Sequence, residues 1–589
     1  MKKNYLQKLM AGALAGVMAM SMLAGCGGGN AEETTAETPA APAETNTDTK
    51  EEAPAETPAE APAETPAADT AEAPAGAAGM ESWEAFADNV TIKIPVYDRG
   101  VEGVPAIGEN YWETWIQENF GDKYNITVEF EPITRTDVLT SYSLLAAADD
   151  LPTILMEYDY PKLAQWANDG YLTTYDLDQF AQIAPTYYNR MVDLDQIQYT
   201  TMNDERYFVL AERPYYNTNY TFVTFYRQDW LDQIGLDKYP TTWADEKAMY
   251  QKLKDEGICD YPAGGHMASE AGVDQNYAFR TYPQDELTWA TVGHYAIPAL
   301  SSDAQKGFLK RENELYNLGF KNPEYYITDV ETDKANFVNG DCLFFSGYIS
   351  AEVDFVKAFY EKNPDGKLGI KISENVVDSA EGTVPYAFRS NNPWGMMIGF
   401  SSQASEDQIK AAMMYMEWMT QEENLFTMQW GAEGEHYEMQ DGLPVQIEYT
   451  GSDKTQGFNN NKDYWCVTIE ARTAGTIEDV IAASSPKNVP QDFTQDIIEN
   501  YKGQVALAEA GYSVVDCNYS VVIESEGEYQ ATLLSLYTEY RDQLTMCKPE
   551  EFDALYDELS QKYLDAGYQD IIDERAEAYN AGNSTKLPQ

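Results

Sequence analysis

Histidine, which many catalytic and transition-metal sites require, is rare in the sequence. His266, His294 and His436 are the only histidines among 589 residues, so a zinc enzyme or a Ser-His hydrolase would have to build its site from these three. The H-E-x-x-H pattern, the Walker A loop, a G-x-G-x-x-G turn after a strand and the G-x-S-x-G elbow are all missing. We therefore predict no catalytic residue, no metal site and no cofactor. Together with the targeting signal and the linker described below, the missing motifs favour a binding role over an enzymatic one.

The cysteines do not follow a metal-binding or disulfide pattern. Apart from Cys26 there are five, and none of them lies in a C-x-x-C spacing. Five thiols cannot all pair, and zinc sites usually supply their thiolates at such short spacings. Buried free thiols are therefore predicted at Cys259, Cys342, Cys466, Cys517 and Cys547.

Apolar periodicity predicts the elements that would position a site. Residues 92–96 and 126–130 alternate between apolar and polar, which is typical of strands, and residues 110–120 carry aromatic side chains at helical spacing. A strand, a helix and a strand within about forty residues fit a βαβ unit with a parallel sheet. Residues 151–156 predict a third strand, and the fold class is therefore α/β.

Aromatic and charged residues directly follow two of these strands. Tyr97 and Arg99 follow the first strand, and Tyr158 and Tyr160 follow the third. Open α/β sheets bind ligands at the carboxyl ends of their strands. We therefore predict that these four side chains contact a ligand, the alternative being ordinary loop structure.

Two helices are predicted later in the chain. Ser405 and Gln408 have the spacing of a capping box, and an apolar helical pattern follows them as far as Thr420. Residues 550–580 are helical in composition. No repeat of 20–50 residues is present in the folded part of the sequence.

The first residues read as a targeting signal. Lys2, Lys3 and Lys8 precede an apolar, small-residue stretch at 9–22, which ends at the sequence Leu-Ala-Gly-Cys. That sequence resembles the lipobox of bacterial lipoproteins, which implies that residues 1–25 are removed and that Cys26 is lipidated. A single transmembrane anchor is the alternative, but the apolar stretch is marginal for a bilayer.

Residues 26–80 are predicted to form a disordered linker. They contain an eight-residue duplication, EAPAETPA, at 52–59 and 60–67. Until Met80 the linker proper offers no apolar side chain larger than Ala, so it cannot form a core. Frequent prolines and like charges extend such a chain, which would hold a folded body away from a membrane.

Charge, composition and length limit which partners the protein can have and how large its folded part can be. Lys plus Arg total 39 and Asp plus Glu total 98, a formal net charge of −59. This excess acts against a nucleic-acid partner and against an anionic membrane surface, and it disfavours a strongly anionic ligand. Aromatic residues make up 13% of the chain, and its length suffices for two lobes with sizeable cores.

Several stretches of the sequence occur in the order that is typical of one family. Residues 227–236 read RQDWLDQIGL, and residues 430–438 read WGAEGEHYE. These stretches resemble the family of extracellular solute-binding proteins (family 1), which deliver sugars and related solutes to ABC importers, and the second resembles a block of its larger lipoprotein subgroup. Weaker matches lie at 144–152, at 336–343, where Asp341 and Cys342 depart from the pattern, and at 563–568 with 576–580.

The resemblance implies a periplasmic-binding-protein-like fold of type II: two α/β lobes joined by a hinge, with the ligand cleft between the lobes. Lobe 1 would comprise 81–213 and 366–420, and lobe 2 would comprise 214–365 and 421–589. Some members carry a calcium loop rich in Asp and Asn. Here the corresponding place, 254–260, reads KDEGICD and lacks the oxygen ligands, so no calcium is predicted.

A sugar site needs aromatic platforms and a few placed polar groups, and the resemblance suggests further candidates for it. Each candidate has a blander alternative: core packing for the aromatic residues, an ion pair for Arg227, and a structural clasp between the lobes for the histidine loop. The candidates are Arg227, Trp289, Phe345, Trp394, Trp430, His436 and Tyr437.

The sequence thus predicts a monomeric, lipid-anchored protein on the outer face of the cell membrane. It would bind a sugar or oligosaccharide by hinge closure and deliver it to the permease subunits of an ABC transporter. A surface polysaccharide hydrolase or lyase is the alternative, because 98 acidic residues offer too many carboxylate pairs to dismiss one.

Overall fold

The computed structural model describes residues 79–100, 105–216, 218, 222–263, 286–292, 297–328, 330–348, 353–372, 388–447, 449–456, 458–487, 489–511 and 513–585. All of them belong to one contact unit, Asp69–Gln589. The predicted signal peptide, Cys26 and almost all of the linker lie outside the described residues, as do His266 and His294.

The predicted βαβ unit is present. Strand β1 (Val90–Asp98) pairs in parallel with β2 (Ile126–Thr134). The helix between them begins at α2 (Tyr111–Ile116), where the Asn110 side chain accepts hydrogen bonds from two backbone N–H groups, and continues through π-helical η2 (Gln117–Gly121) and α3 (Asp122–Tyr124). Trp112 and Ile116 are buried, so the aromatic face of this helix packs into the core.

The third strand lies beside β1 and joins a second sheet. The Thr153 backbone N–H donates to the carbonyl of Lys93 at 2.9 Å, and β3 (Ile154–Glu157) then pairs antiparallel with β12 (Trp394–Ser401). Strand β12 also pairs with β4 (Leu172–Thr173) and β7 (Phe208–Glu212). Every residue of β3 and β12 is buried, which explains their nearly continuous apolar sequences.

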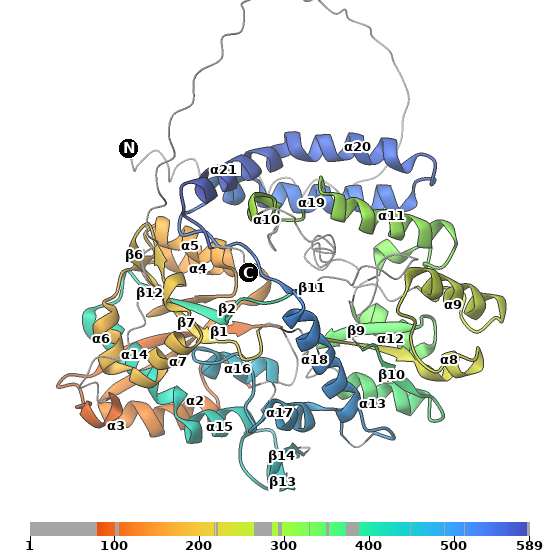
Figure 1. Ribbon diagram of the computed structural model, residues 1–589. Helices are drawn as coiled ribbons and strands as arrows, with labels where there is room; N and C mark the ends of the chain where they lie inside the picture. The colour runs from red at the N-terminus through yellow and green to blue at the C-terminus, as the bar shows by residue number, and fades with distance from the viewer. Residues whose placement is uncertain are drawn as a thin grey trace, which may run out of the picture. The chain divides into compact units, whose positions relative to one another are not determined.

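Helices and short segments complete this first half of the fold (Figure 1). They are η1 (Gly79–Ser82), η3 (Arg135–Asp137), α4 (Val138–Ala147), α5 (Tyr160–Asn168), α6 (Leu177–Ile183), α7 (Pro185–Asp193), η4 (Ile197–Tyr199), β5 (Thr201–Met202) and β6 (Glu205–Arg206).

Helix α14 (Glu406–Thr420) begins at the predicted capping box. The Ser405 hydroxyl accepts from the Gln408 backbone N–H at 3.3 Å, and the Gln408 side chain accepts from the Ser405 backbone N–H at 2.9 Å. The sequence pattern predicts that only one face of this helix is buried, but every residue from Ala411 to Thr420 is buried. The helix is covered on several sides because it packs against β1, α6, α7 and α15 (Glu422–Trp430).

We expect Ser405→Ala to lower the free energy of unfolding by about 1 kcal/mol, because it leaves backbone N–H groups of the first turn of α14 without their acceptor. Urea denaturation measures the change. The exposed Ser452 is the control, and its replacement by Ala should change stability by less than about 0.5 kcal/mol. Equal stability of the two variants would contradict a capping role.

A separate sheet, of three antiparallel strands, forms the second half of the fold and has β8 (Phe222–Arg227) at its centre between β9 (Phe344–Tyr348) and β10 (Leu368–Ile370). Its core is rich in phenylalanine, including Phe225, Phe337 and Phe359. The helices of this half are α8 (Gln228–Gln233), α9 (Trp243–Asp255), α12 (Val330–Asn339), α13 (Val353–Lys362), α17 (Ile477–Ser484) and α18 (Thr494–Glu509).

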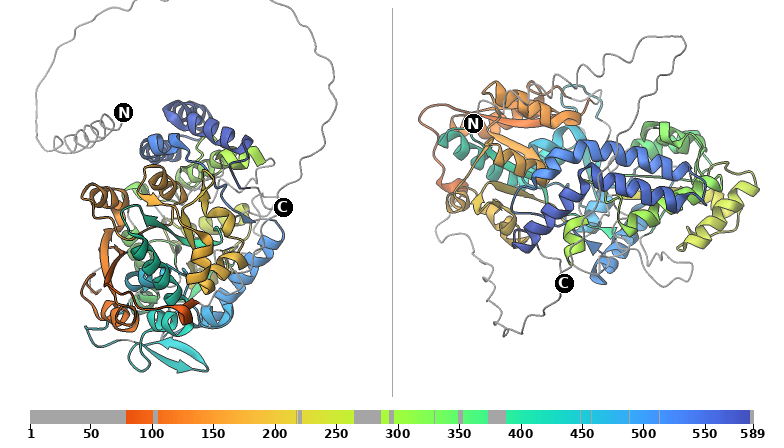
Figure 2. Two further views of the ribbon diagram at one scale, coloured as in Figure 1. Left: turned by 90° about the vertical axis from the view of Figure 1, so that its left-hand side faces the viewer. Right: turned by 90° about the horizontal axis from the view of Figure 1, so that it is seen from above.

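A third apolar cluster lies in the C-terminal helices, which are blue in Figures 1 and 2 and lie side by side. As predicted, residues 550–580 are helical. The C-terminal helices are α19 (Glu524–Met546), α20 (Phe552–Tyr563), π-helical η7 (Leu564–Tyr568) and α21 (Gln569–Asn580). Two earlier helices, which are green in Figure 1, pack against them: α10 (Glu286–Val292) against α21 and α11 (Asp303–Asn317) against α19. The short helix η6 (Tyr325–Ile327) follows α11 in the sequence. None of the described helices is both long and apolar enough to span a membrane.

In the described part of the chain, three segments that lead from the sheet of β12 to the sheet of β8, or back, meet near Arg213. These segments follow β7, precede β12 and follow Ile469. The Arg213 backbone N–H donates to Pro393, the Glu470 N–H donates to the Glu212 carbonyl at 2.8 Å, and the Arg213 and Glu470 side chains form an ion pair. Strand β11 (Phe388–Arg389), which lies shortly before β12 in the sequence, pairs in parallel with β15 (Ser513–Val514).

The packing differs from the predicted lobe boundaries at two segments. β10, placed in 366–420 of lobe 1, pairs with β8 instead, because Leu368 and Ile370 fill the second core. Residues of α15 and α16 (Phe458–Cys466), placed in lobe 2, pack in the first core through side chains such as Met428 and Trp465. The hairpin β13 (Tyr437–Gln440) and β14 (Leu443–Gln446) lies between α15 and α16 in the sequence.

Candidate functional site

The residues predicted after β1 are held by an aspartate from α16. Asp463 is fully buried, and its carboxylate accepts hydrogen bonds from the Tyr97 backbone N–H at 3.0 Å and from Arg99 Nη1 and Nη2 at 2.7 and 3.0 Å. Burial opposes the charge on Arg99, but the Asp463 carboxylate outweighs burial and raises the pKa of the guanidinium. A bidentate ion pair with Asp463 therefore fixes the position of the Arg99 guanidinium.

Tyr97 and Tyr158 lie together at the carboxyl ends of β1 and β3. The Tyr97 hydroxyl donates to the carbonyl of Met156 at 2.7 Å, which ties the two strand ends to each other. Arg135, directly after β2, places its Cζ atom 4.9 Å from the ring centroid of Tyr97 and 5.9 Å from that of Tyr158. Lys462 Nζ lies 5.8 Å from the Tyr158 ring centroid.

Two buried polar atoms at this place have no hydrogen-bond partner among the described residues. They are the Tyr158 hydroxyl and Oε2 of Glu157. Burial raises the pKa of Tyr158 well above its ordinary value, so the hydroxyl stays protonated and can donate. The strand ends therefore bring together aromatic rings, the guanidinium that Asp463 fixes, and buried polar atoms without partners among the described residues, which are the kinds of groups that a sugar site uses.

The other predicted aromatic residues are packed against the protein itself. Tyr160 contacts Phe208, and Trp394 packs on Tyr199 with ring centroids 4.4 Å apart. Trp289 is completely buried and donates from Nε1 to the Val515 carbonyl at 2.7 Å. Phe345 packs on Phe355 at 4.9 Å.

Arg227 is paired rather than exposed to a cleft. Its guanidinium binds the Asp229 carboxylate with distances of 2.9 and 2.6 Å and lies over the Trp230 ring at 4.4 Å. Only 6% of the residue surface is exposed. Of the two alternatives left open by the sequence, the contacts match the ion pair.

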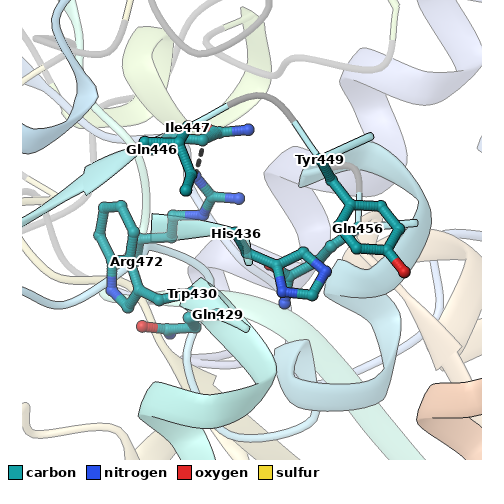
Figure 3. Close-up of a pocket in the computed structure, with 8 residues that line it drawn as sticks. All are labelled: Gln429, Trp430, His436, Gln446, Ile447, Tyr449, Gln456 and Arg472. Carbon is teal, nitrogen blue, oxygen red and sulfur yellow. Dashed lines mark hydrogen bonds between the residues drawn. The ribbon is translucent and has the colours of Figure 1, made fainter. Parts of the chain in front are cut away.

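Trp430 and His436 line a small cavity of about 110 Å³ (Figure 3). His436 Nδ1 accepts from the Ala432 backbone N–H at 3.1 Å, so its Nε2 carries the proton and donates to the Lys454 carbonyl at 2.8 Å. The His436 ring stacks on Tyr449 with centroids 4.6 Å apart. Both imidazole nitrogens are thus used in holding the loop, while Tyr437 packs on Phe426. The cavity is lined by Gln429, Trp430, His436, Gln446, Ile447, Tyr449, Gln456 and Arg472.

A larger cavity, of about 400 Å³, lies in the second half of the fold and includes none of the predicted binding residues. Its lining residues are Gly257, Ile258, Cys259, Asp260, Tyr261, Lys321, Asn322, Tyr325, Thr328, Asp333, Asn336, Gly340, Asp341 and Cys342.

The cysteines of the body are free, as predicted, and all except the half-buried Cys547 are buried. Burial raises the pKa of Cys259 to about 11, which makes that thiol a poor nucleophile. Within the described part of the chain, no group of three or more His, Cys, Asp or Glu is arranged to hold a metal ion.

The sequence analysis missed Arg135 and Asp463. Arg135 follows β2, so the rule that selected Tyr97 and Tyr158 would have selected it as well. Asp463 carries no such signal, because it lies 364 positions after Arg99 and reaches the site only through the packing of α16 against β1.

With the fold and this geometry in place, comparison with known proteins decides the family. A family model described as bacterial extracellular solute-binding protein matches residues 105–425, more than half of the chain. The chain belongs to the bacterial extracellular solute-binding proteins. The resemblance noted in the sequence is thereby confirmed, and membership implies that this solute-binding protein acts outside the cytoplasm.

Solved structures share the fold of this solute-binding protein at low sequence identity. The alginate-binding protein AlgQ2, crystallised without calcium ion, has a TM-score of 0.56 at 13% identity, covering 85% of this chain and 99% of that chain. An HMO-binding, ABC-transporter-associated protein from Bifidobacterium longum infantis gives 0.56 at 14% identity, over 84% and 99%. The S. pneumoniae protein FusA in complex with kestose gives 0.54 at 13% identity, over 84% and 99%.

These likenesses confirm the predicted fold class, a type II periplasmic-binding-protein fold of two α/β lobes. A comparison with curated proteins found no match.

Asp159, next to the site, should make the stability of the solute-binding protein depend on pH. Burial, with smaller contributions from Glu157 and Glu526, raises the pKa of Asp159 to about 6 against the opposing attraction of Lys162, whose Nζ lies 3.5 Å away. The native state then holds the proton more tightly than the unfolded chain does, so unfolding free energy falls as pH rises from about 4 to 6.

We therefore expect Asp159→Asn to raise the free energy of unfolding at pH 7.5, by up to about 3 kcal/mol for two pKa units, and by much less at pH 4.5. Denaturation with urea at both pH values tests this. The exposed Asp88 serves as the control, with no pH-dependent gain on replacement by Asn. A gain for Asp159→Asn that is equal at both pH values would contradict the prediction.

Proposed function

We propose that this protein binds a sugar or oligosaccharide reversibly at the carboxyl ends of β1, β2 and β3 and releases it unchanged. The observation that carries the proposal is the cluster of Tyr97, Arg99 and Tyr158, where ring faces, a fixed guanidinium and an unsatisfied buried hydroxyl meet. Sugars present apolar C–H faces and a ring of hydroxyl groups, which such a cluster complements.

Closure of the two lobes around the solute is part of the proposal. The segments that connect the two halves are joined to one another through Glu212, Arg213, Pro393 and Glu470, which favours a common hinge there. A solute that contacts both lobes only when they are closed shifts the equilibrium toward the closed form.

The proposed cellular role is that of a lipoprotein that delivers its solute to the permease subunits of an ABC transporter. Its support is the family together with the lipobox-like sequence that ends at Cys26. Two acyl chains on Cys26 would anchor the protein stably, and the linker to residue 80 would give the body reach. Replacing Cys26 by Ser should abolish incorporation of labelled palmitate and release the protein from membranes.

A ligand panel tests the binding function. A sugar or oligosaccharide should raise the melting temperature of the full-length protein, and small-angle scattering should show compaction on binding. Tyr158→Phe should weaken binding about tenfold by removing one hydrogen bond, whereas Tyr326→Phe at an exposed position should leave it unchanged. Release of shortened sugars from a polymer would instead support the hydrolase or lyase alternative.

A further inference from the structure

Arg135 is placed among the proposed sugar-binding groups without a counter-ion from the protein. It is half-buried in η3, directly after β2. Its guanidinium contacts the rings of Tyr97 and Tyr158, and the described residues supply it with no ion pair and no hydrogen bond. Ring contacts satisfy the face of a guanidinium but not its five N–H donors.

Three other arginines in the described part of the chain are each paired with a carboxylate. Arg99 holds Asp463, Arg227 holds Asp229 and Arg575 holds Glu526, at closest distances of 2.7, 2.6 and 2.7 Å. The chain has 98 Asp and Glu residues but only 39 Lys and Arg residues, so carboxylates that could pair with a half-buried arginine are plentiful. The absence of one at Arg135 suggests that its anionic partner comes from outside.

We infer that Arg135 is a specificity-determining residue, and that it makes the site prefer acidic sugars, whose carboxylate or sulfate group it binds. The inference rests on the proposed function and names the class of its solute. A guanidinium binds both kinds of anion through two parallel N–H bonds.

The surroundings of Arg135 are compatible with an anion despite the acidity of the chain. Arg99 and Lys462 lie beside the same tyrosines. The carboxylate of Asp463 is engaged by Arg99, Oε1 of Glu157 accepts from the Tyr158 backbone N–H, and Asp98 accepts from the Gly100 N–H. Repulsion from distant surface acids is screened beyond about 8 Å at physiological ionic strength, whereas the contact with Arg135 acts at short range.

The experiment compares matched charged and neutral sugars on the full-length protein. A thermal-shift panel contains oligogalacturonates, sulfated glycosaminoglycan disaccharides, and neutral oligosaccharides including the methyl esters of the same galacturonates. Titration calorimetry then measures the dissociation constants. We expect an acidic sugar to bind about ten to a hundred times more tightly than its uncharged counterpart. The carboxylated and sulfated members distinguish the two sources of negative charge.

Variants identify the residue responsible. Arg135→Gln should abolish the preference for the charged sugar, because it weakens binding of the charged sugar far more than binding of its neutral counterpart, while Arg135→Lys should retain part of the preference. Lys123→Gln removes the same charge at an exposed position and should have no effect. Melting temperatures without sugar verify that each variant is folded.

The outcomes separate the inference from the proposed function. Binding of neutral sugars only, or equal binding of acid and ester by the unmodified protein, overturns the inference and leaves the proposed function standing. A preference for acidic sugars that survives Arg135→Gln overturns the assignment to Arg135. No binding by any sugar, charged or neutral, contradicts the proposed function and the inference with it.

Discussion

Replacement of Asp463 by Ala should destabilise the protein by about 3–5 kcal/mol and disorganise the proposed sugar site. The fully buried carboxylate receives the Tyr97 backbone N–H and both terminal nitrogens of Arg99. Its removal leaves the largely buried guanidinium of Arg99 without this carboxylate, and breaking such an ion pair from one side is costly. Sugar affinity should fall as well, because Tyr97 and Arg99 lose the group that positions them.

Urea denaturation followed by tryptophan fluorescence measures the loss of stability, and calorimetry measures the loss of affinity. Asp150→Ala is the matched control. It removes the same carboxylate from an ion pair with Lys93, but 56% of the Asp150 side chain is exposed, so the cost should be below about 1 kcal/mol. If the two variants were equally stable, Asp463 would not be the structural centre of the site.

The carboxyl ends of the strands could be predicted from the sequence because the information is local. Alternation at 92–96 and 126–130 identified β1 and β2, and the register of a parallel pair then places Arg135 near Arg99. The helix after Ser405 was likewise predictable, since a capping box is a short-range pattern. The position of Asp463 was not, because it depends on how α16 packs against β1.

Aromatic residues show why the composition of a site could not be read from the sequence. Tyr158 and Trp289 both follow the pattern expected of a sugar platform, yet the first lies at a strand end and the second is completely buried with its Nε1 bonded to Val515. Tyr and Trp side chains occur both in protein cores and in binding clefts, so the residue type alone does not tell the two apart. Only the tertiary contacts distinguish a core ring from a binding ring. The predicted lobe boundary at residue 366 depends on tertiary contacts in the same way, because Leu368 and Ile370 of β10 pack in the second core.

Replacement of Glu526 by Ala should be as damaging as that of Asp463, but in the C-terminal helices and far along the sequence from the strand ends. Arg575 of α21 is fully buried and donates from Nε to Glu526 of α19 at 2.7 Å and from Nη1 to the Thr291 carbonyl of α10 at 2.8 Å. Burial disfavours the charge of Arg575, and the Glu526 carboxylate outweighs this and raises the pKa of the guanidinium. Without Glu526 the buried charge is uncompensated, at a cost of about 3–5 kcal/mol.

The double variant Glu526→Leu/Arg575→Met separates the loss of one partner from the value of the pair. When both charges are replaced by apolar side chains of similar size, nothing buried remains unneutralised, and stability should return to within about 1–2 kcal/mol of the original. The exposed pair of Glu558 and Lys562, with 60% and 54% of the side chains exposed, is the control: Glu558→Ala should cost less than about 1 kcal/mol. A double variant no more stable than Glu526→Ala would mean that the pair holds α10, α19 and α21 together through its geometry rather than through charge neutralisation.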